Sequence, residues 1–421
     1  MENSLPIGWA SASLETISGM VYGKGLLTKE LTQEGYPVYG ANGVIGKYPT
    51  YLYEDERIII SCRGAASGVL HKTVPKSFIT SNSIVFNLKS NEIDLDYFRY
   101  SLLSVDRSKI VTGTAQPQIT IENLKDLQIP IAPLAEQQRI VAKLDELMEK
   151  IDRSRARLER IPKILKRFRQ SILSAAVSGK LTEKWRGKNE LTDQWEEKEL
   201  KDVIIDKPKN GFSAKPVSHK TNFRVLTLTA TTSGRFNPNH YKYFEEPIDK
   251  NSQFWLQPND ILVQRGNTLE YVGVSAIYDG LPNQFIYPDL MMRLRVNEMI
   301  TTKFLYYFMS DEVTRDYLRD RATGTSGNMP KINQPTLMGV PISLPTIKEQ
   351  NEIVRRVEQL FSLADKIEAR YHKAKAQIDR LPQSLLAKAF RGELVPQDKN
   401  DDPANVLLER MQSSKTKKVK V

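Results

Sequence analysis

The sequence is poor in the residue types that most often build metal sites and disulfides. One cysteine and four histidines occur among its 421 residues, and His71, His219, His240 and His372 are scattered. A single thiol excludes a disulfide within the chain and a cysteine-based metal cluster. No apolar run reaches the length that a bilayer requires, and the first residues lack the pattern of a signal peptide. These absences predict a soluble protein of the reducing cytoplasm.

Signatures of catalysis and nucleotide binding are missing as well. The sequence contains no GxxxxGK[ST] phosphate loop, no GxGxxG after a strand and no HExxH motif. Cys62 follows an apolar, strand-like run, which favours a buried thiol over a nucleophile. Acidic residues are plentiful, but no pair stands out as an acid and its base. Because all of these signatures are missing together, we expect a binding subunit and not an enzyme.

Acidic residues are outnumbered by basic ones. The chain has 61 Lys and Arg against 50 Asp and Glu, a net charge of +11. Such a balance favours a polyanionic partner, although on charge alone a merely basic soluble protein fits equally well. Residues 150–188 hold 13 basic and 3 acidic side chains, which suits either a solvated helix face or a face that meets phosphate or a partner protein.

What the chain does contain is a long internal repeat. "EQQRIVAKLDEL" (136–147) returns as "EQNEIVRRVEQL" (349–360), an offset of 213 residues, and the match continues without a gap for more than forty residues. Weaker parallels lie upstream, namely 56–68 with 260–273, 113–124 with 324–337, and Trp9 with Trp195. The sequence therefore predicts a tandem duplication, in which each copy is a globular block followed by a helical segment.

Apolar residues in both helical segments recur every seven residues, which is typical of a two-helix coiled coil. Each narrow stripe needs one partner helix, and the other segment is the obvious partner; packing on the neighbouring globular block is the alternative. Two similar helices of one chain pair most simply in antiparallel orientation. Pro162 and Pro382, which are not at equivalent positions, predict kinks or breaks. The predicted interface residues are Ile140, Leu144, Leu147, Ile151, Leu158, Ile161, Leu165, Ile353, Val357, Leu360, Ile367, Tyr371, Ile378 and Leu381.

The predicted fold class is α+β, with two globular domains separated by an antiparallel coiled coil of two long helices and related by a pseudo-two-fold internal duplication. A chain of this length is expected to form two or more domains. The predicted boundaries are a first globular domain at 1–133, a helical region at 134–182, a second globular domain at 183–345, a second helical region at 346–395, and a basic, disordered tail at 396–421.

Loops of both globular blocks combine glycine with side chains that recognise nucleic acid. Asn, Gln and Arg make paired hydrogen bonds to base edges, and Lys meets phosphate or guanine, although an ordinary surface loop is the alternative at each position. The strongest candidates for base contacts are Arg63 and Arg265, which the alignment places at equivalent ends of a strand. We expect Arg265→Ala to relax sequence preference in one half-site only. The candidate DNA-binding residues are Asn42, Lys47, Tyr48, Arg63, Gln116, Gln118, Lys209, Asn210, Gln264, Arg265, Asn267, Asn328, Lys331 and Asn333.

The motifs "IPIAPLAEQQRIVAKLDEL" (129–147) and "VPISLPTIKEQNEIVRRVEQL" (340–360) resemble the conserved regions of type I restriction–modification specificity subunits. That resemblance implies two target recognition domains, each reading one half of a split, asymmetric site in double-stranded DNA, with the helices fixing the spacing. It also implies docking of two modification (methyltransferase) subunits and of restriction (motor–nuclease) subunits. S-adenosylmethionine, ATP and magnesium would then belong to these partners, with no cofactor in this chain.

Two alternatives to this function stay open from the sequence. One is a non-catalytic coiled-coil scaffold without sequence-specific DNA binding, which would show neither steep salt dependence nor sequence preference. The other is a self-sufficient nuclease or methyltransferase, which the missing motifs disfavour.

Overall fold

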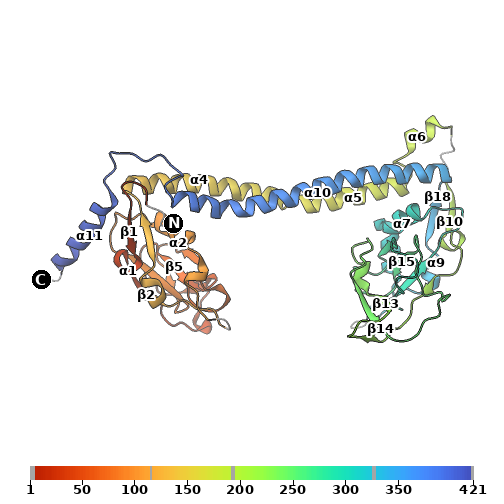
Figure 1. The fold of residues 1–421 in the computed structure, drawn as a ribbon, viewed down its shortest axis with the longest axis horizontal. Coiled ribbons are helices and arrows are strands. Elements are labelled where there is room, and N and C mark those ends of the chain that lie inside the picture. The colour runs from red at the N-terminus through yellow and green to blue at the C-terminus, as the bar shows by residue number, and fades with distance from the viewer. Residues whose placement is uncertain (1–4, 114–115, 191–194, 325–328, 419–421) are drawn as a thin grey trace. The chain divides into compact units, whose positions relative to one another are not determined.

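The computed structural model describes residues 5–113, 116–190, 195–324 and 329–418, which form two compact units (Figure 1). Unit 1 combines residues 1–159 with 373–421, and unit 2 is formed by residues 160–372. Each unit contains one globular block and one pair of helices. The long helix α10 (Ile347–Ala389) contributes its amino half to unit 2 and its carboxyl half to unit 1. Within the described residues, no helix is both long enough and apolar enough to cross a bilayer.

The globular block of unit 1 holds three small sheets. Their strand orders are β1-β9, β2-β8-β5-β6 and β4-β3-β7. The central strand β5 consists of three isoleucines and a serine, all buried, as the β-branched content of a strand covered on both faces predicts. The strands are β1 (Ala10–Ser13), β2 (Ser18–Tyr22), β3 (Tyr36–Gly40), β4 (Gly43–Tyr48), β5 (Ile58–Ser61), β6 (Leu70–Lys72), β7 (Phe78–Ile79), β8 (Ser83–Leu88) and β9 (Gln128–Ile131); the helices are α1 (Leu14–Ile17), α2 (Leu95–Ser104), α3 (Ile121–Lys125), α4 (Leu134–Leu158) and α11 (Ala404–Lys418).

Unit 2 repeats this sheet plan with orders β10-β18, β11-β17-β15-β16 and β12-β14-β13. The two-stranded and four-stranded sheets match those of unit 1 strand for strand, whereas the three-stranded sheets differ, because β3 and β7 pair in parallel while β12, β14 and β13 are all antiparallel. The strands are β10 (Glu196–Glu199), β11 (Lys209–Asn210), β12 (Pro216–Val217), β13 (Phe223–Leu226), β14 (Tyr241–Phe244), β15 (Ile261–Gln264), β16 (Ser275–Ile277), β17 (Met291–Leu294) and β18 (Pro341–Leu344); the helices are α5 (Ile161–Val177), α6 (Glu183–Lys188), α7 (Thr302–Ser310), α8 (Glu312–Asp320) and α9 (Gln334–Met338). The internal duplication is therefore visible in the topology.

In unit 1, α4 lies along the carboxyl half of α10 in antiparallel orientation (Figure 1). Leu144 shares a buried cluster with Leu386 and Ala389. Further along α4, Arg155 pairs with Asp379 at 3.2 Å, so α4 advances along the chain while its partner runs back. This helix pair also packs on the globular block, because Tyr97 and Tyr100 of α2 belong to the same cluster.

In unit 2, α5 pairs with the amino half of α10, again in antiparallel orientation. Arg169 binds Asp365 at 2.6 Å, and further along the chain Arg356 Nη1 donates to the carbonyl oxygen of Leu181 at 2.7 Å. Ile172 and Leu173 lie in the same buried cluster as Ile353 and Val357, together with α7 of the globular block. The predicted antiparallel pairing is thus confirmed inside each unit.

Most of the residues predicted for the helix interface are buried or half-buried, but the prediction is wrong at two positions. Ile367 is 38% exposed and Leu381 is 42% exposed. A straight α-helix drifts by about 20° per heptad from a strict seven-residue repeat, so the buried side of a long helix moves on to the next row. Glu368 and Lys375, which belong to that next row, are accordingly half-buried.

The two prolines have different consequences. Pro162 lies in the first turn of α5, after α4 has ended at Leu158, so it marks a break between two helices. Proline fits the first helical turn, where its missing N–H has no acceptor to lose. Pro382 lies inside α10, which continues to Ala389. The expected kink or break is therefore present as a break at Pro162, while Pro382 leaves the helix uninterrupted.

The prediction of a disordered tail at 396–421 is wrong for the residues that form α11. Ala404, Leu407 and Met411 are buried in the core cluster of the unit 1 block, beside strand residues such as Ile58. Arg410 adds an ion pair with Glu92 at 3.2 Å. The basic composition of the last residues suggested disorder, but the spacing of 404, 407 and 411 gives this helix an apolar face that the block covers.

Candidate nucleic-acid interface

The structure brings together three of the predicted DNA-binding residues at the end of β5 in unit 1. Arg63 forms a backbone bridge with Gln118, and Gly64 N donates to the carbonyl oxygen of Pro117 at 3.0 Å. Gln118 also exchanges two backbone hydrogen bonds of 2.8 Å with Thr112, which closes the loop on itself. The side chains of Arg63, Gln116 and Gln118 are exposed. A guanidinium and two amides therefore project from one end of the block.

Unit 2 has the same arrangement at the end of β15. Gly266 bridges to Lys331, and Asn267 N donates to the carbonyl oxygen of Pro330 at 3.3 Å. Lys331 forms a backbone bridge with Thr323, as Gln118 does with Thr112 in unit 1. The side chain of Lys331 is exposed. Asn328, the other predicted residue of this loop, lies outside the described residues.

The predicted equivalence of Arg63 and Arg265 is wrong by one residue. The carbonyl oxygen of Cys62 accepts from Ile119 N at 3.0 Å, and the carbonyl oxygen of Arg265 accepts from Ile332 N at 2.8 Å. Arg265 thus takes the place of Cys62. Since extended residues alternate between faces, its side chain points away from the face that Arg63 presents. Arg265 is half-buried, and its Nε is buried without a hydrogen-bond partner among the described residues.

Gln264 and Asn267 hold the backbone rather than face outward. Gln264 is fully buried, and its Nε2 donates to the carbonyl oxygen of Leu228 and to Thr231 Oγ1, both at 2.9 Å. Its Oε1 accepts from Asn267 Nδ2 at 2.6 Å, and Asn267 Oδ1 in turn accepts from Thr268 N. The prediction that Gln264 contacts DNA is therefore wrong, and the Asn267 amide is committed to the same internal network.

A hairpin adds to the same end of the unit 1 block. Asn42 is exposed in the turn between β3 and β4. The carbonyl oxygen of the preceding residue accepts from Ser61 Oγ, two residues before Arg63, so the turn is held beside the Arg63 loop. Lys47 is exposed on β4, while the half-buried ring of Tyr48 packs edge-on against Phe78 at 5.2 Å.

The remaining predicted residues of unit 2 lie on another strand of the same sheet or at the cap of a helix. Lys209 and Asn210 form β11, which β17 separates from β15, so they lie about 10 Å from the Arg265 strand. Asn333 caps α9, because its Oδ1 accepts from Thr336 N at 2.8 Å. Thr120 caps α3 at the matching place in unit 1, which makes capping the shared role of this position.

A duplicated buried glutamine fixes each helix pair to its block. Gln137 Oε1 accepts from the backbone N of Asp94 at 2.9 Å, and Gln350 Oε1 accepts from that of Thr301 at 2.8 Å. Each Nε2 donates to the carbonyl oxygen five residues earlier, at 2.8 and 2.9 Å. Asp94 and Thr301 cap α2 and α7, so the glutamine joins the cap of one helix to the start of another. The repeat pointed to these positions, but the sequence did not reveal their role.

The glutamates beside these glutamines are both buried but have different surroundings. Glu349 Oε1 accepts from Arg186 Nη1 and Thr182 Oγ1, both at 2.6 Å, and its Oε2 accepts from Trp195 Nε1 at 3.2 Å. Glu136 Oε2 accepts from Trp9 Nε1 at 3.1 Å, and among the described residues this carboxylate forms no ion pair. Burial raises the pKa of Glu136 above its usual range.

Comparisons with known proteins agree with this duplicated plan. Residues 6–163 and 192–376 match the family described as "Type I restriction modification DNA specificity domain". The chain is 32% identical over 447 aligned positions to the type I restriction enzyme EcoKI specificity subunit of Escherichia coli (strain K12), covering 99% of this chain and 96% of that protein. It is also 32% identical to the type I restriction enzyme StySPI specificity subunit of Salmonella potsdam, covering 95% and 92%.

Two solved structures share the fold. A chain from a study of complex assembly and conformational transition of the type I R-M system has a TM-score of 0.70 at 18% identity, covering 93% of this chain and 99% of that chain. The HsdS subunit from Thermoanaerobacter tengcongensis has a TM-score of 0.56 at 19% identity, covering 93% and 99%.

Proposed function

The chain belongs to the family of type I restriction–modification DNA specificity subunits, and we propose that it selects the DNA sequence on which such a complex acts. Each globular block then serves as a target recognition domain that reads one half of a bipartite, asymmetric site in double-stranded DNA. The observation that carries this proposal is the duplicated strand-end loop, which in each unit presents exposed side chains able to meet bases or phosphates: Arg63 and Gln118 in unit 1, Lys331 in unit 2.

The chemistry of these side chains suits direct readout in the major groove. Arginine pairs bidentately with the O6 and N7 of guanine, and glutamine pairs with the N6 and N7 of adenine. Arg63 and Gln118 lie side by side on paired backbones, so they can address neighbouring base pairs. In this proposal the helix pairs set the spacing between the two half-sites.

The chemistry of methylation and cleavage belongs to other subunits in this proposal. The chain docks two modification (methyltransferase) subunits and, with them, restriction (motor–nuclease) subunits in the cytoplasm. S-adenosylmethionine, ATP and magnesium are bound by those partners, and this chain is not itself catalytic. A pull-down from native cells with this chain as bait tests the partner assignment, since a methyltransferase is expected as the main co-purifying protein.

Methylome sequencing of cells with and without the gene for this chain tests the function itself. We expect a methylated motif of two short halves and an unspecified spacer that disappears on deletion and returns on complementation. An unchanged methylome would contradict the proposal. A scaffold that does not read DNA would leave the methylome unchanged and would bind DNA with neither sequence preference nor steep salt dependence.

A further inference from the structure

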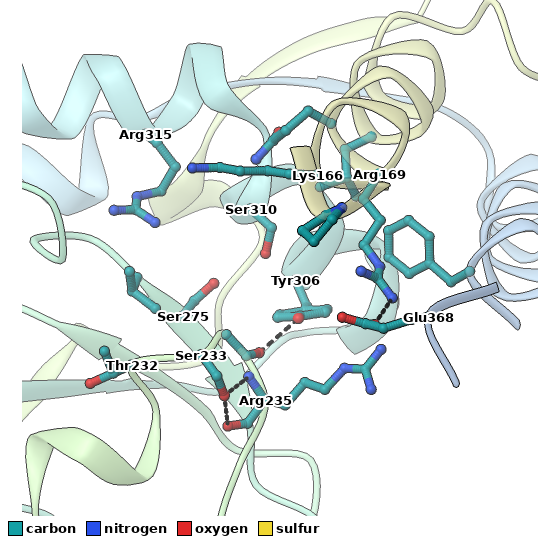
Figure 2. Close-up of a pocket in the computed structure, with 16 residues that line it drawn as sticks. Lys166, Arg169, Thr232, Ser233, Arg235, Ser275, Tyr306, Ser310, Arg315 and Glu368 are labelled. Atoms are coloured by element: carbon teal, nitrogen blue, oxygen red, sulfur yellow. Dashed lines mark hydrogen bonds and ion pairs between the residues drawn. The ribbon is translucent and has the colours of Figure 1, made fainter. Parts of the chain in front are cut away.

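A pocket of about 530 Å³ opens in unit 2 where α5 meets the globular block (Figure 2). Its walls come from α5, from residues 232–235, from the start of β16, from α7 and α8, and from two side chains of α10. Both the recognition block and its helix pair therefore contribute to one pocket. The basic stretch 150–188 includes α5, but the other walls of the pocket are distant in sequence, so the sequence alone does not reveal the pocket.

The lining carries an excess of positive charge. Lys166, Arg169, Arg235 and Arg315 line the pocket, and Glu368 is the acidic residue of the lining. Arg169 pairs with Glu368 at 2.8 Å, and both Arg169 and Arg235 reach Asp365, which adds a second carboxylate. Four cations therefore face two carboxylates, and the surplus rests on Lys166 and Arg315.

These two cations have no carboxylate of their own among the described residues. Arg315 Nη2 donates to the carbonyl oxygens of Glu270 and Val272, at 2.8 and 3.0 Å. Burial lowers the pKa of Arg315 to about 10, so the guanidinium is still charged at neutral pH. Lys166 is exposed on α5, and Figure 2 shows its amine and the Arg315 guanidinium directed toward the same side of the pocket.

Polar atoms of the lining are also left without partners. Ser275 is 2% exposed, and its hydroxyl oxygen is buried without a hydrogen bond within the described residues. The Nε atoms of Arg169 and Arg315 are in the same condition. Buried polar atoms of native proteins are nearly always hydrogen-bonded, and each exception calls for an explanation such as an absent ligand. Donors of this kind fit a ligand that carries negative charge and several acceptor oxygens.

The pocket is not a by-product of the duplication. At the offset of 213 residues, Lys166 corresponds to Asp379, Arg169 to Pro382, and Glu368 to Arg155. In unit 1, Arg155 and Asp379 neutralise each other in an ion pair of 3.2 Å. The charge of Lys166 is therefore a feature of unit 2 that the shared fold does not explain, whereas Arg315 has a counterpart in unit 1, where Arg107 donates to the carbonyl oxygen of Ser67.

We propose that this pocket holds a phosphate of the DNA backbone in the half-site read by unit 2, with Lys166 and Arg315 as its charged contacts and the Ser275 hydroxyl as a further donor. Arg, Lys and Ser side chains are typical phosphate partners, and such contacts position a protein without reading sequence. A phosphate bound here joins the helix pair, through Lys166, to the recognition block, through Arg315 and Ser275. The inference rests on the proposed DNA-binding function and adds a sequence-independent anchor to it.

The test compares Lys166→Gln with Lys163→Gln, a matched control. Both changes remove one positive charge from an exposed site on α5, but Lys163 does not line the pocket. The full chain, in the complex with which it co-purifies, is titrated with duplexes of its methylated motif that each carry one neutral methylphosphonate in place of a phosphate. Salt dependence is measured with the unmodified duplex and with an unrelated one.

We expect the wild-type complex to lose roughly tenfold in affinity at one phosphate of the unit 2 half-site, as one charge-assisted contact is worth about that much. Lys166→Gln should bind every sequence roughly tenfold more weakly, should be insensitive to neutralisation of that phosphate, and should show a salt slope smaller by about 0.9. Lys163→Gln should keep the wild-type sensitivity.

Three results would overturn the inference. One is that Lys166→Gln keeps the wild-type response at every phosphate. A second is that the wild type and Lys166→Gln bind DNA equally well, while inorganic phosphate raises the melting temperature of the wild type alone. The pocket would then be a site for a free anion. In both results specific binding is intact, so the proposed function stands. The third is a wild-type complex that does not prefer its motif, which refutes both proposals together.

Discussion

The same substitution at the two duplicated glutamates is expected to act in opposite directions. Glu349 is 2% exposed and forms an ion pair with the buried Arg186, whereas Glu136 is 1% exposed and, within the described part of the chain, meets a tryptophan N–H but no cation in an ion pair. Glutamine has nearly the same shape as glutamate but lacks its charge. Glu349→Gln therefore breaks a buried ion pair, while Glu136→Gln removes a buried charge whose hydrogen bonds from Trp9 and Gln397 and attraction to Arg139 do not outweigh the effect of burial.

The magnitudes follow from these surroundings. Breaking a buried ion pair by removing one partner costs about 3–5 kcal/mol. A loss of about 3 kcal/mol in unit 2 corresponds to a roughly 100-fold increase in the local opening equilibrium. Glu136→Gln is expected to be neutral or stabilising in unit 1, since burial of this carboxylate costs free energy that the amide avoids.

The pH dependence supplies an independent check on Glu136. Burial raises the pKa of its carboxyl in the folded state above the ordinary value. A carboxyl whose pKa is raised by folding contributes most to stability when it is protonated, below its unfolded pKa. It loses that contribution as the pH rises through the folded pKa and the buried group becomes charged. The gain from Glu136→Gln should therefore be present at pH 7 and shrink as the solution is acidified.

Hydrogen exchange followed by mass spectrometry measures both effects in the full chain. It reports local opening, which is needed because a protein of two units does not unfold in one step. Peptides from the amino ends of α4 and α10 report unit 1 and unit 2, respectively. Equal effects of the two substitutions, or unchanged exchange of α10 in Glu349→Gln, would show that the two carboxylates do not differ in this way.

Three further predictions concern other regions. Arg63→Ala should cost about 1–3 kcal/mol of discrimination at one base pair of one half-site, and Arg265→Ala less, as seen in methylation of variant sites; equal loss on all sequences would make Arg63 a phosphate contact. Leu407→Ala, at a position 6% exposed, should destabilise unit 1 by about 2–5 kcal/mol in hydrogen exchange, and unchanged exchange would show that α11 is dispensable. Hydrogen bonds from Arg355 and Arg356 lower the pKa of Glu352 to about 2, so the advantage of wild type over Glu352→Gln in melting temperature should hold above pH 4.5 and vanish toward pH 2.

The architecture was accessible from the sequence because it depends on periodicity. An ungapped offset of 213 residues predicts duplicated helical segments, and heptad spacing predicts which side of each helix is buried. The heptad rule failed at Ile367 and Leu381, because it assumes a strict seven-residue repeat along a helix of 43 residues. The sequence also did not show that the helix breaks at Pro162 but continues through Pro382. Proline is tolerated in the first turn of a helix and also inside helices that are held by packing.

The placement of the candidate DNA-binding side chains was harder to predict, because a strand end is defined by backbone pairing and not by composition. An Arg-Gly pair ends both strand-like runs, yet the hydrogen bonds to Ile119 and Ile332 shift Arg265 into the place of Cys62. A shift by one residue moves a side chain to the opposite face. Gln264 is buried and Asn333 caps α9 for a related reason: an amide that recognises a base can equally bind its own backbone. The number of competing acceptors nearby is visible only in the fold.

The positions where the two units differ are as informative as those where they agree. Two equivalent places carry different residues, Cys62 against Arg265 and Asp379 against Lys166, and the equivalent glutamates Glu136 and Glu349 have different partners. Backbone hydrogen bonds and buried glutamines are kept at the same time, so each block is tied to its helices in the same way. An asymmetric DNA site needs this combination, because two half-sites of different sequence call for different surfaces, whereas a constant spacing calls for identical attachment. A duplication that preserved the attachment and let the surfaces diverge can therefore change its target sequence without losing its geometry.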